Sequence, residues 1–338
     1  CADDTASNYC IAIGHNVMKS ATMSAANHNV AIGYAAATTL ATGTENVVIG
    51  SGAGATMTAA RYCILIGKSA GAAITDNDAE STIAIGYNSG LAHDDGTKCI
   101  YIGHKTGLSN ESGDNLVAIG HSAMLNTGDY INDNNIAIGT SAMGGSWGGA
   151  CVKNVAIGTS AMAGVMNASN ANVAIGHQAG NAITSGGYNI LIGAHAGEKL
   201  EDGGSNIVIG GSALDLTESG VNNVAIGVGA LGSATDGDDD PDSNVAIGSS
   251  ALFSLDADDA EQANVAIGHN SGYWLSTGIR NTFLGHKSGF GLDGTPLLGD
   301  YNTCIGYLAG AIIQGAATSN TLIGNLAGDT ITTGTHNI

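Results

Sequence analysis

The sequence predicts an all-β fold, a parallel β-solenoid of about eighteen rungs that are each 17–21 residues long. Three observations predict it. The segment Asn-Val-Ala-Ile-Gly recurs with small changes along the whole chain, β-branched residues alternate within each copy, and the intervening segments are rich in Gly, Asp, Asn, Ser and Thr. A repeat of this length holds one strand and a return loop, because a βαβ unit needs roughly 30 residues.

We number each repeat from its closing glycine, which is position 0. Position −1 is Ile in seventeen of the eighteen copies, and position −3 is always Val, Ile or Thr. Such residues at a spacing of two predict a strand from −3 to −1 in every repeat. The closing glycines are Gly14, Gly33, Gly50, Gly67, Gly86, Gly103, Gly120, Gly139, Gly158, Gly176, Gly193, Gly210, Gly227, Gly248, Gly268, Gly285, Gly306 and Gly324.

Identical positions of successive rungs are expected to stack into columns. Position −4 is Asn in thirteen copies, which predicts a ladder of amides that donate and accept hydrogen bonds along the stack. Glycine at position 0, and in ten copies at +4, predicts the corners of the coil. Met and Leu at the other +4 positions, such as Met143 and Leu231, are expected to fill the core rather than bind a soft metal.

Position −2 is apolar too, so both faces of the strand are expected to be dry. We expect −1 and −3 to point into the coil and −2, which is Ala in ten copies, to point outward against other copies of the chain. The solenoids would then pack side by side along their length. The predicted interface residues are Ala137, Ala156, Ala174, Ala225, Ala246 and Ala266.

Charge and cysteine usage narrow the functional classes. The net charge is −20, with only 9 Lys and Arg, which argues against a nucleic acid or an anionic membrane as partner. No apolar stretch approaches the roughly 20 residues of a membrane-spanning helix, so no direct membrane insertion is expected in this segment. Cys10, Cys63 and Cys99 all occupy position −4, in rungs too far apart for a disulfide.

The repeat resembles that of a known group of proteins. Asn172-Val-Ala-Ile-Gly-His-Gln-Ala179 and Asn244-Val-Ala-Ile-Gly-Ser-Ser-Ala251 look like the head repeats of trimeric autotransporter adhesins, and are also similar to repeat-rich tail-fibre proteins of bacteriophages. The resemblance implies a left-handed β-roll with three chains around one axis. It also implies an extracellular location, on a cell surface or a virion appendage.

Two groups of side chains are candidates for metal binding. Six histidines occupy position +1, where a threefold assembly would bring imidazoles together around a metal or an anion, and where an exposed polar column is the other interpretation. Two acidic spacers leave consecutive rungs and offer oxygen ligands for Ca²⁺, although a solvated charge run is the default interpretation of such spacers. The candidate Ca²⁺ ligands are Asp236, Asp238, Asp240, Asp242 and Asp258. No other cofactor is expected.

These observations predict a non-enzymatic structural or adhesive fibre, used for attachment or as the shaft of a surface appendage or phage tail fibre. Its partners would be further copies of the chain and a host surface protein or glycan, with Trp147 and the pair Tyr273-Trp274 as the best aromatic contacts. One alternative is a solenoid polysaccharide depolymerase, which would need carboxylates of neighbouring rungs to converge in a groove. The other is a passive self-assembling filament.

The domain organisation is expected to be a single repeat solenoid over residues 1–338. His336-Asn337-Ile338 open a nineteenth copy of the repeat, so we expect the chain to be a segment of a longer array.

Overall fold

The chain is an all-β parallel β-solenoid of about 16–18 coils. The computed structural model describes residues 9–20, 23–75, 79–234, 241–255, 262–292, 297–313, 317–331 and 334–338, and these contain no α-helix. The chain divides into two compact units, Cys1–Asn170 and Ala171–Ile338, which we describe separately.

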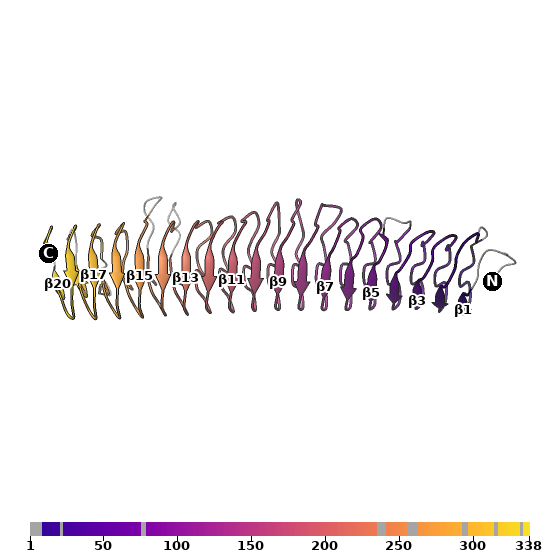
Figure 1. The fold of residues 1–338 in the computed structure, drawn as a ribbon, viewed down its shortest axis with the longest axis horizontal. Helices are drawn as coiled ribbons and strands as arrows, with labels where there is room; N and C mark the ends of the chain where they lie inside the picture. Colours follow the sequence, from indigo (N-terminus) through magenta and orange to yellow (C-terminus); the bar gives the residue numbers. More distant parts are fainter. Residues whose placement is uncertain are drawn as a thin grey trace. The chain divides into compact units, whose positions relative to one another are not determined.

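The first unit contains nine three-residue strands that pair in parallel in chain order (Figure 1). Each strand aligns with the next position by position, as in Ala137 opposite Ala156. The strands are β1 (Ile11–Ile13), β2 (Val30–Ile32), β3 (Val47–Ile49), β4 (Ile64–Ile66), β5 (Ile83–Ile85), β6 (Ile100–Ile102), β7 (Val117–Ile119), β8 (Ile136–Ile138) and β9 (Val155–Ile157). The predicted strand at −3 to −1 is therefore confirmed.

The second unit repeats this arrangement with nine further three-residue strands, each pairing in parallel with the next. They are β10 (Val173–Ile175), β11 (Ile190–Ile192), β12 (Ile207–Ile209), β13 (Val224–Ile226), β14 (Val245–Ile247), β15 (Val265–Ile267), β16 (Thr282–Leu284), β17 (Thr303–Ile305) and β19 (Thr321–Ile323). Two short strands, β18 (Ile312–Ile313) and β20 (Thr330–Ile331), pair separately with each other.

The orientation of the strands is the reverse of the predicted one. From β2 onward in these three-residue strands, the middle residue at −2 is buried, and the residues at −3 and −1 are half-buried or exposed. The predicted interface alanines have no exposed surface within their own chain, so they cannot contact a partner; they are Ala137, Ala156, Ala174, Ala225, Ala246 and Ala266. The physical reason is the alternation of a strand, because −2 must share the inner face with the buried asparagine at −4.

Side chains at −2, +3, +4 and +7 fill the interior of most coils, and Trp147 and Met166 at +8 do so in two coils where the +7 residue is exposed. Ala156, Ala161 and Met162 of one coil are all fully buried, which confirms that the +4 methionines are core residues. The closing glycines occupy the corner with φ between 132° and 143°, a region of backbone space that other residues avoid. A Cβ on Gly210 would overlap with the carbonyl oxygen of Gly227 in the next coil, so the coils stack closely at this corner.

Candidate functional site

The asparagine ladder at −4 is a structural element. The side-chain oxygen of Asn206 accepts hydrogen bonds from the backbone N–H (2.9 Å) and side-chain amide (3.2 Å) of Asn223. Its own amide nitrogen donates to the carbonyl of Gly220 at 2.8 Å and to Asn189 Oδ1 at 3.0 Å. The ladder was predicted, and it satisfies polar groups that would be costly to bury unpaired.

Four consecutive coils of the first unit depart from this ladder, with Cys63, Thr82, Cys99 and Leu116 at −4. The cysteines take over part of the amide's role, since Cys99 Sγ donates to the carbonyl of Gly113 at 2.8 Å. Burial raises the pKa of both Cys63 and Cys99 to about 11, which keeps these thiols protonated and unreactive. Cys63, Cys99, Cys151 and Cys304 are free thiols, as the spacing of those at −4 predicted.

Thr82 is too short to reach the acceptor, and a histidine from the +7 column replaces it. His93 Nε2 lies 2.7 Å from the carbonyl oxygen of Gly96 and 3.3 Å from Thr82 Oγ1. His93 Nδ1 lies 3.3 Å from the hydroxyl of Tyr101, and that hydroxyl donates to Asn110 at 2.8 Å. Burial lowers the pKa of His93 and raises the pKa of Tyr101, so both are neutral at pH 7.

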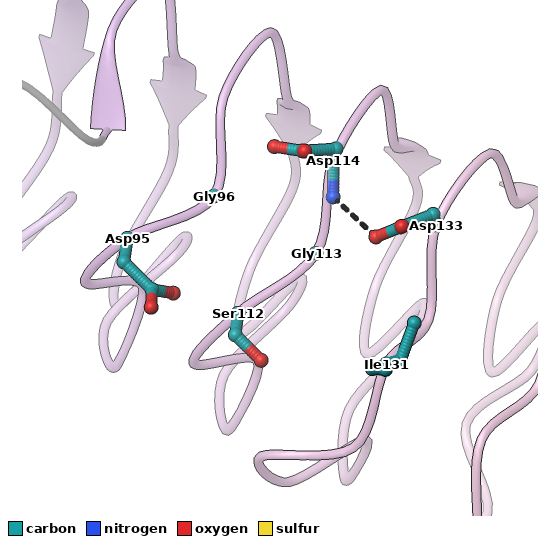
Figure 2. Close-up of a pocket in the computed structure, with 7 residues that line it drawn as sticks. All are labelled: Asp95, Gly96, Ser112, Gly113, Asp114, Ile131 and Asp133. Atoms are coloured by element: carbon teal, nitrogen blue, oxygen red, sulfur yellow. Dashed lines mark hydrogen bonds between the residues drawn. The ribbon is translucent and has the colours of Figure 1, made fainter.

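A shallow depression of about 230 Å³ lies on the surface of the same coils (Figure 2). Its lining residues are Asp95, Gly96, Ser112, Gly113, Asp114, Ile131 and Asp133. It holds acidic side chains of neighbouring coils, which the depolymerase alternative needs in a common groove. In Figure 2 the three carboxylates lie on successive loops and do not point toward a common centre.

Two carboxylates of this depression accept hydrogen bonds from backbone N–H groups. Asp114 Oδ1 accepts from the N–H of Thr97 at 2.7 Å, and Asp133 Oδ1 accepts from the N–H of Asp114 at 2.9 Å. Both occupy position −6, and Asp242 and Asp300 at the same position make the equivalent bonds to Val221 and Ile279 in the second unit. Aspartates at −6 are therefore another ladder of the repeat, which does not favour the depolymerase alternative.

The predicted Ca²⁺ ligands Asp236, Asp238, Asp240 and Asp258 lie outside the described residues. Asp242 is described, and its side-chain oxygen is 2.7 Å from the Val221 nitrogen. In the described part of the chain, no cluster of three or more His, Cys, Asp or Glu has the geometry to hold a metal ion.

The outer face of the strands is a continuous apolar feature of the repeat. Two branched side chains per strand, at −3 and −1, form parallel columns within each unit. Several are more than a third exposed, including Ile190 (38 %), Ile207 (39 %) and Leu284 (42 %). We call these columns the outer Val/Ile face.

Rings stack in the neighbouring +1 column. All six histidines at +1 are exposed within their own chain. Tyr87, His104 and His121 form one stack with ring centroids 5.1–5.2 Å apart, and His269, His286 and Tyr307 form another at 5.2–5.5 Å.

The two predicted aromatic contacts have different outcomes. Trp147 is 6 % exposed and belongs to the core. Tyr273 and Trp274 are half-buried and lie among further aromatic side chains on the surface of the second unit.

Comparison with models of known protein families and with curated protein sequences finds no match to the chain. The described residues contain no helix that is long and apolar enough to span a membrane. The fold and the stacked side chains define the chain as a β-solenoid repeat protein.

Proposed function

We propose that the chain is a non-enzymatic segment of an extracellular fibre, in which copies associate side by side through the outer Val/Ile face. The observation that carries this proposal is the face itself, which is apolar in coil after coil and is left uncovered by its own chain. Such a fibre would mediate attachment or form the shaft of an appendage. The left-handed winding, the number of three chains and the extracellular location come from the resemblance of the repeat.

The size of the face supports association. If each outer side chain exposes roughly 40–50 Å², the two columns of nine strands present about 800 Å² of apolar surface, which matches the area per partner of a standard interface. The largest apolar patch of a typical monomer covers only about 300–600 Å². Burial of about 800 Å² at about 25 cal/mol per Å² gives roughly 20 kcal/mol, more than the estimated 4–15 kcal/mol that association costs.

Light scattering of paired variants tests the proposal. Val224→Asp with Ile226→Asp places two charges on the outer face of β13 and should convert the assembled protein to monomers with an unchanged circular dichroism spectrum. Val165→Asp with Leu216→Asp is the matched control, because these side chains are 58 % and 40 % exposed in loops away from the face. The proposal fails if the wild-type chain is a monomer at micromolar concentration, or if both pairs of substitutions have the same effect.

A further inference from the structure

The phenylalanine and tryptophan side chains outside the core gather at one place in the second unit. The chain has only 3 phenylalanines and 2 tryptophans, and Phe283 and Trp147 are buried in the core. The remaining Phe253, Phe290 and Trp274 lie together with Tyr273. We call these four residues the aromatic patch.

The geometry of the patch follows from the repeat. Phe253, Tyr273 and Phe290 occupy position +5 of three successive coils, with centroids 5.0 and 5.7 Å apart. Trp274 at +6 packs edge-on against Tyr273, with a centroid distance of 4.9 Å and an interplanar angle of 70°. The ring of Tyr273 therefore fixes the orientation of the indole.

Small residues flank the half-buried indole of Trp274 along the stack. The +6 positions on either side of Trp274 are Ser254 and Gly291, and neither has a side chain large enough to cover an indole face. A Cβ at Gly291 would stand only 2.7 Å from Trp274 Cβ, so glycine is needed for this close approach. The ammonium of Lys287 lies 4.9 Å from the ring centre of Phe290, which adds a hydrogen-bond donor at the edge of the patch.

We propose that the aromatic patch binds a neutral saccharide, with a pyranose ring stacked on the indole of Trp274. A pyranose presents a face of C–H groups to an aromatic ring and a rim of hydroxyl groups to polar neighbours, here Ser254 and Lys287. This site gives the proposed fibre a glycan as its attachment ligand, and so rests on the proposed function.

Area and charge select this ligand. The four rings each leave about a third or less of roughly 150–250 Å² in solvent, at most about 300 Å² together. That is far below the roughly 800 Å² per partner of a stable protein interface, but suits one or two sugar rings. A net charge of −20 disfavours a strongly anionic polymer, which leaves a neutral glycan.

Tryptophan fluorescence provides the test, since Trp147→Phe leaves Trp274 as the sole indole. The probes are gluco-, galacto-, manno- and N-acetylglucosamine oligosaccharides, each titrated separately. At least one should change the Trp274 emission saturably, with a Kd of about 1 mM or tighter. Titration calorimetry with Trp274→Ala should show binding of that probe weakened at least tenfold, and Tyr188→Ala, which removes a 72 % exposed ring elsewhere in the unit, should leave it unchanged.

Two results would overturn the site. One is the absence of any change in emission with all four probes, and the other is equal binding by the Trp274→Ala and wild-type chains. Light scattering of the Trp274→Ala variant separates this site from the proposed assembly. An unchanged oligomeric mass with lost saccharide binding supports the site, whereas loss of assembly would assign the patch to an interface between copies and reject it as a saccharide site.

Discussion

Leu191 fills the space that Gly197 leaves empty inside the same coil. A Cβ at Gly197 would lie 3.0 Å from Leu191 Cδ2, so no larger residue fits at +4 when leucine occupies −2. The pair Ala156 and Met162 has the opposite sizes at the same two positions, and both are fully buried. Large residues at −2 thus face glycine at +4, and alanine at −2 commonly faces methionine or leucine.

This exchange of size predicts strong coupling between the two positions. Leu191→Ala should lower the free energy of unfolding by about 2–5 kcal/mol through a cavity, and Gly197→Met should lower it by about 1–3 kcal/mol through overlap with Leu191. The double variant has the same pair of residues, alanine at −2 and methionine at +4, as Ala156 and Met162. Met162 has a φ of 48°, which shows that methionine tolerates this backbone conformation. A double-mutant cycle in urea should give a coupling energy of at least about 1 kcal/mol, and additive effects would contradict the packing.

Glycine at the corner is predicted to be indispensable, whereas the next residue is replaceable. Gly210→Ala should lower the free energy of unfolding by about 3 kcal/mol or more, because φ is 143° and the new Cβ meets Gly227. Gly211→Ala should change it by at most about 1 kcal/mol, since the nearest atom to its Cβ is 3.8 Å away. Thermal melts measure the stability of the two variants. A similar loss of stability in both would show that the close approach at the corner does not require glycine.

The asparagine ladder predicts a graded response at Asn206. Asn206→Leu should lower the free energy of unfolding by several kcal/mol. It leaves the buried N–H of Asn223 and the carbonyl of Gly220 without partners, and each unpaired group costs about 1–3 kcal/mol. Asn206→Cys should cost less, since Cys99 Sγ reaches the equivalent carbonyl at 2.8 Å. Urea unfolding at pH 7 measures both variants, and an equal loss would mean that cysteine does not substitute for the amide.

Acid should weaken the first unit through His93. Burial lowers its pKa in the folded chain below the ordinary value of about 6.5, so the unfolded chain binds more protons at mildly acidic pH. The contribution of neutral His93 is fully present above about pH 6.5 and is lost as the pH falls below it, with a slope of at most about 1.4 kcal/mol per pH unit. His93→Gln should flatten the dependence of unfolding on pH between about 6.5 and 5.

The exposed His121 supplies the control for this pH effect. His121→Gln should leave the wild-type slope intact, because His121 lies on the surface and has no part in the buried network of His93. Parallel curves for His93→Gln and the wild-type chain would contradict the assignment.

The sequence was sufficient for the elements but not for their orientation. Recurrence of Ile at −1 and Asn at −4 located the strands and the ladder, because these columns hardly vary. Apolar residues on both faces of the strand do not show which face is the inner one. The recurrence of Ile at −1 favours burial of that position, whereas the structure places it on the outer face. The reciprocal sizes of Leu191 with Gly197 and of Ala156 with Met162 carry the missing information, since only side chains that share an interior need to compensate.

The irregular coils were harder to predict. The aspartates at −6, such as Asp114 and Asp242, were hidden because they stand in loops of varying length and share their role with other residues. The buried His93 occupies the +7 column, where apolar residues such as Leu40 are mixed with polar ones such as Asn110. Its signal was the coincidence of a histidine at +7 with a threonine at −4 in one coil, and the partnership became visible only when both side chains were placed in space.

Thiol reactivity at two adjacent residues of β9 tests the outer Val/Ile face most directly. The Ile157→Cys thiol should react in dilute protein, more slowly than an exposed Val165→Cys control because Ile157 is half-buried, and should become protected as the concentration rises and copies assemble. The Ala156→Cys thiol should be unreactive at every concentration, because that position points into the coil. A reactive Ala156→Cys thiol, or an Ile157→Cys thiol whose reactivity relative to the Val165→Cys control does not change with concentration, would contradict the account.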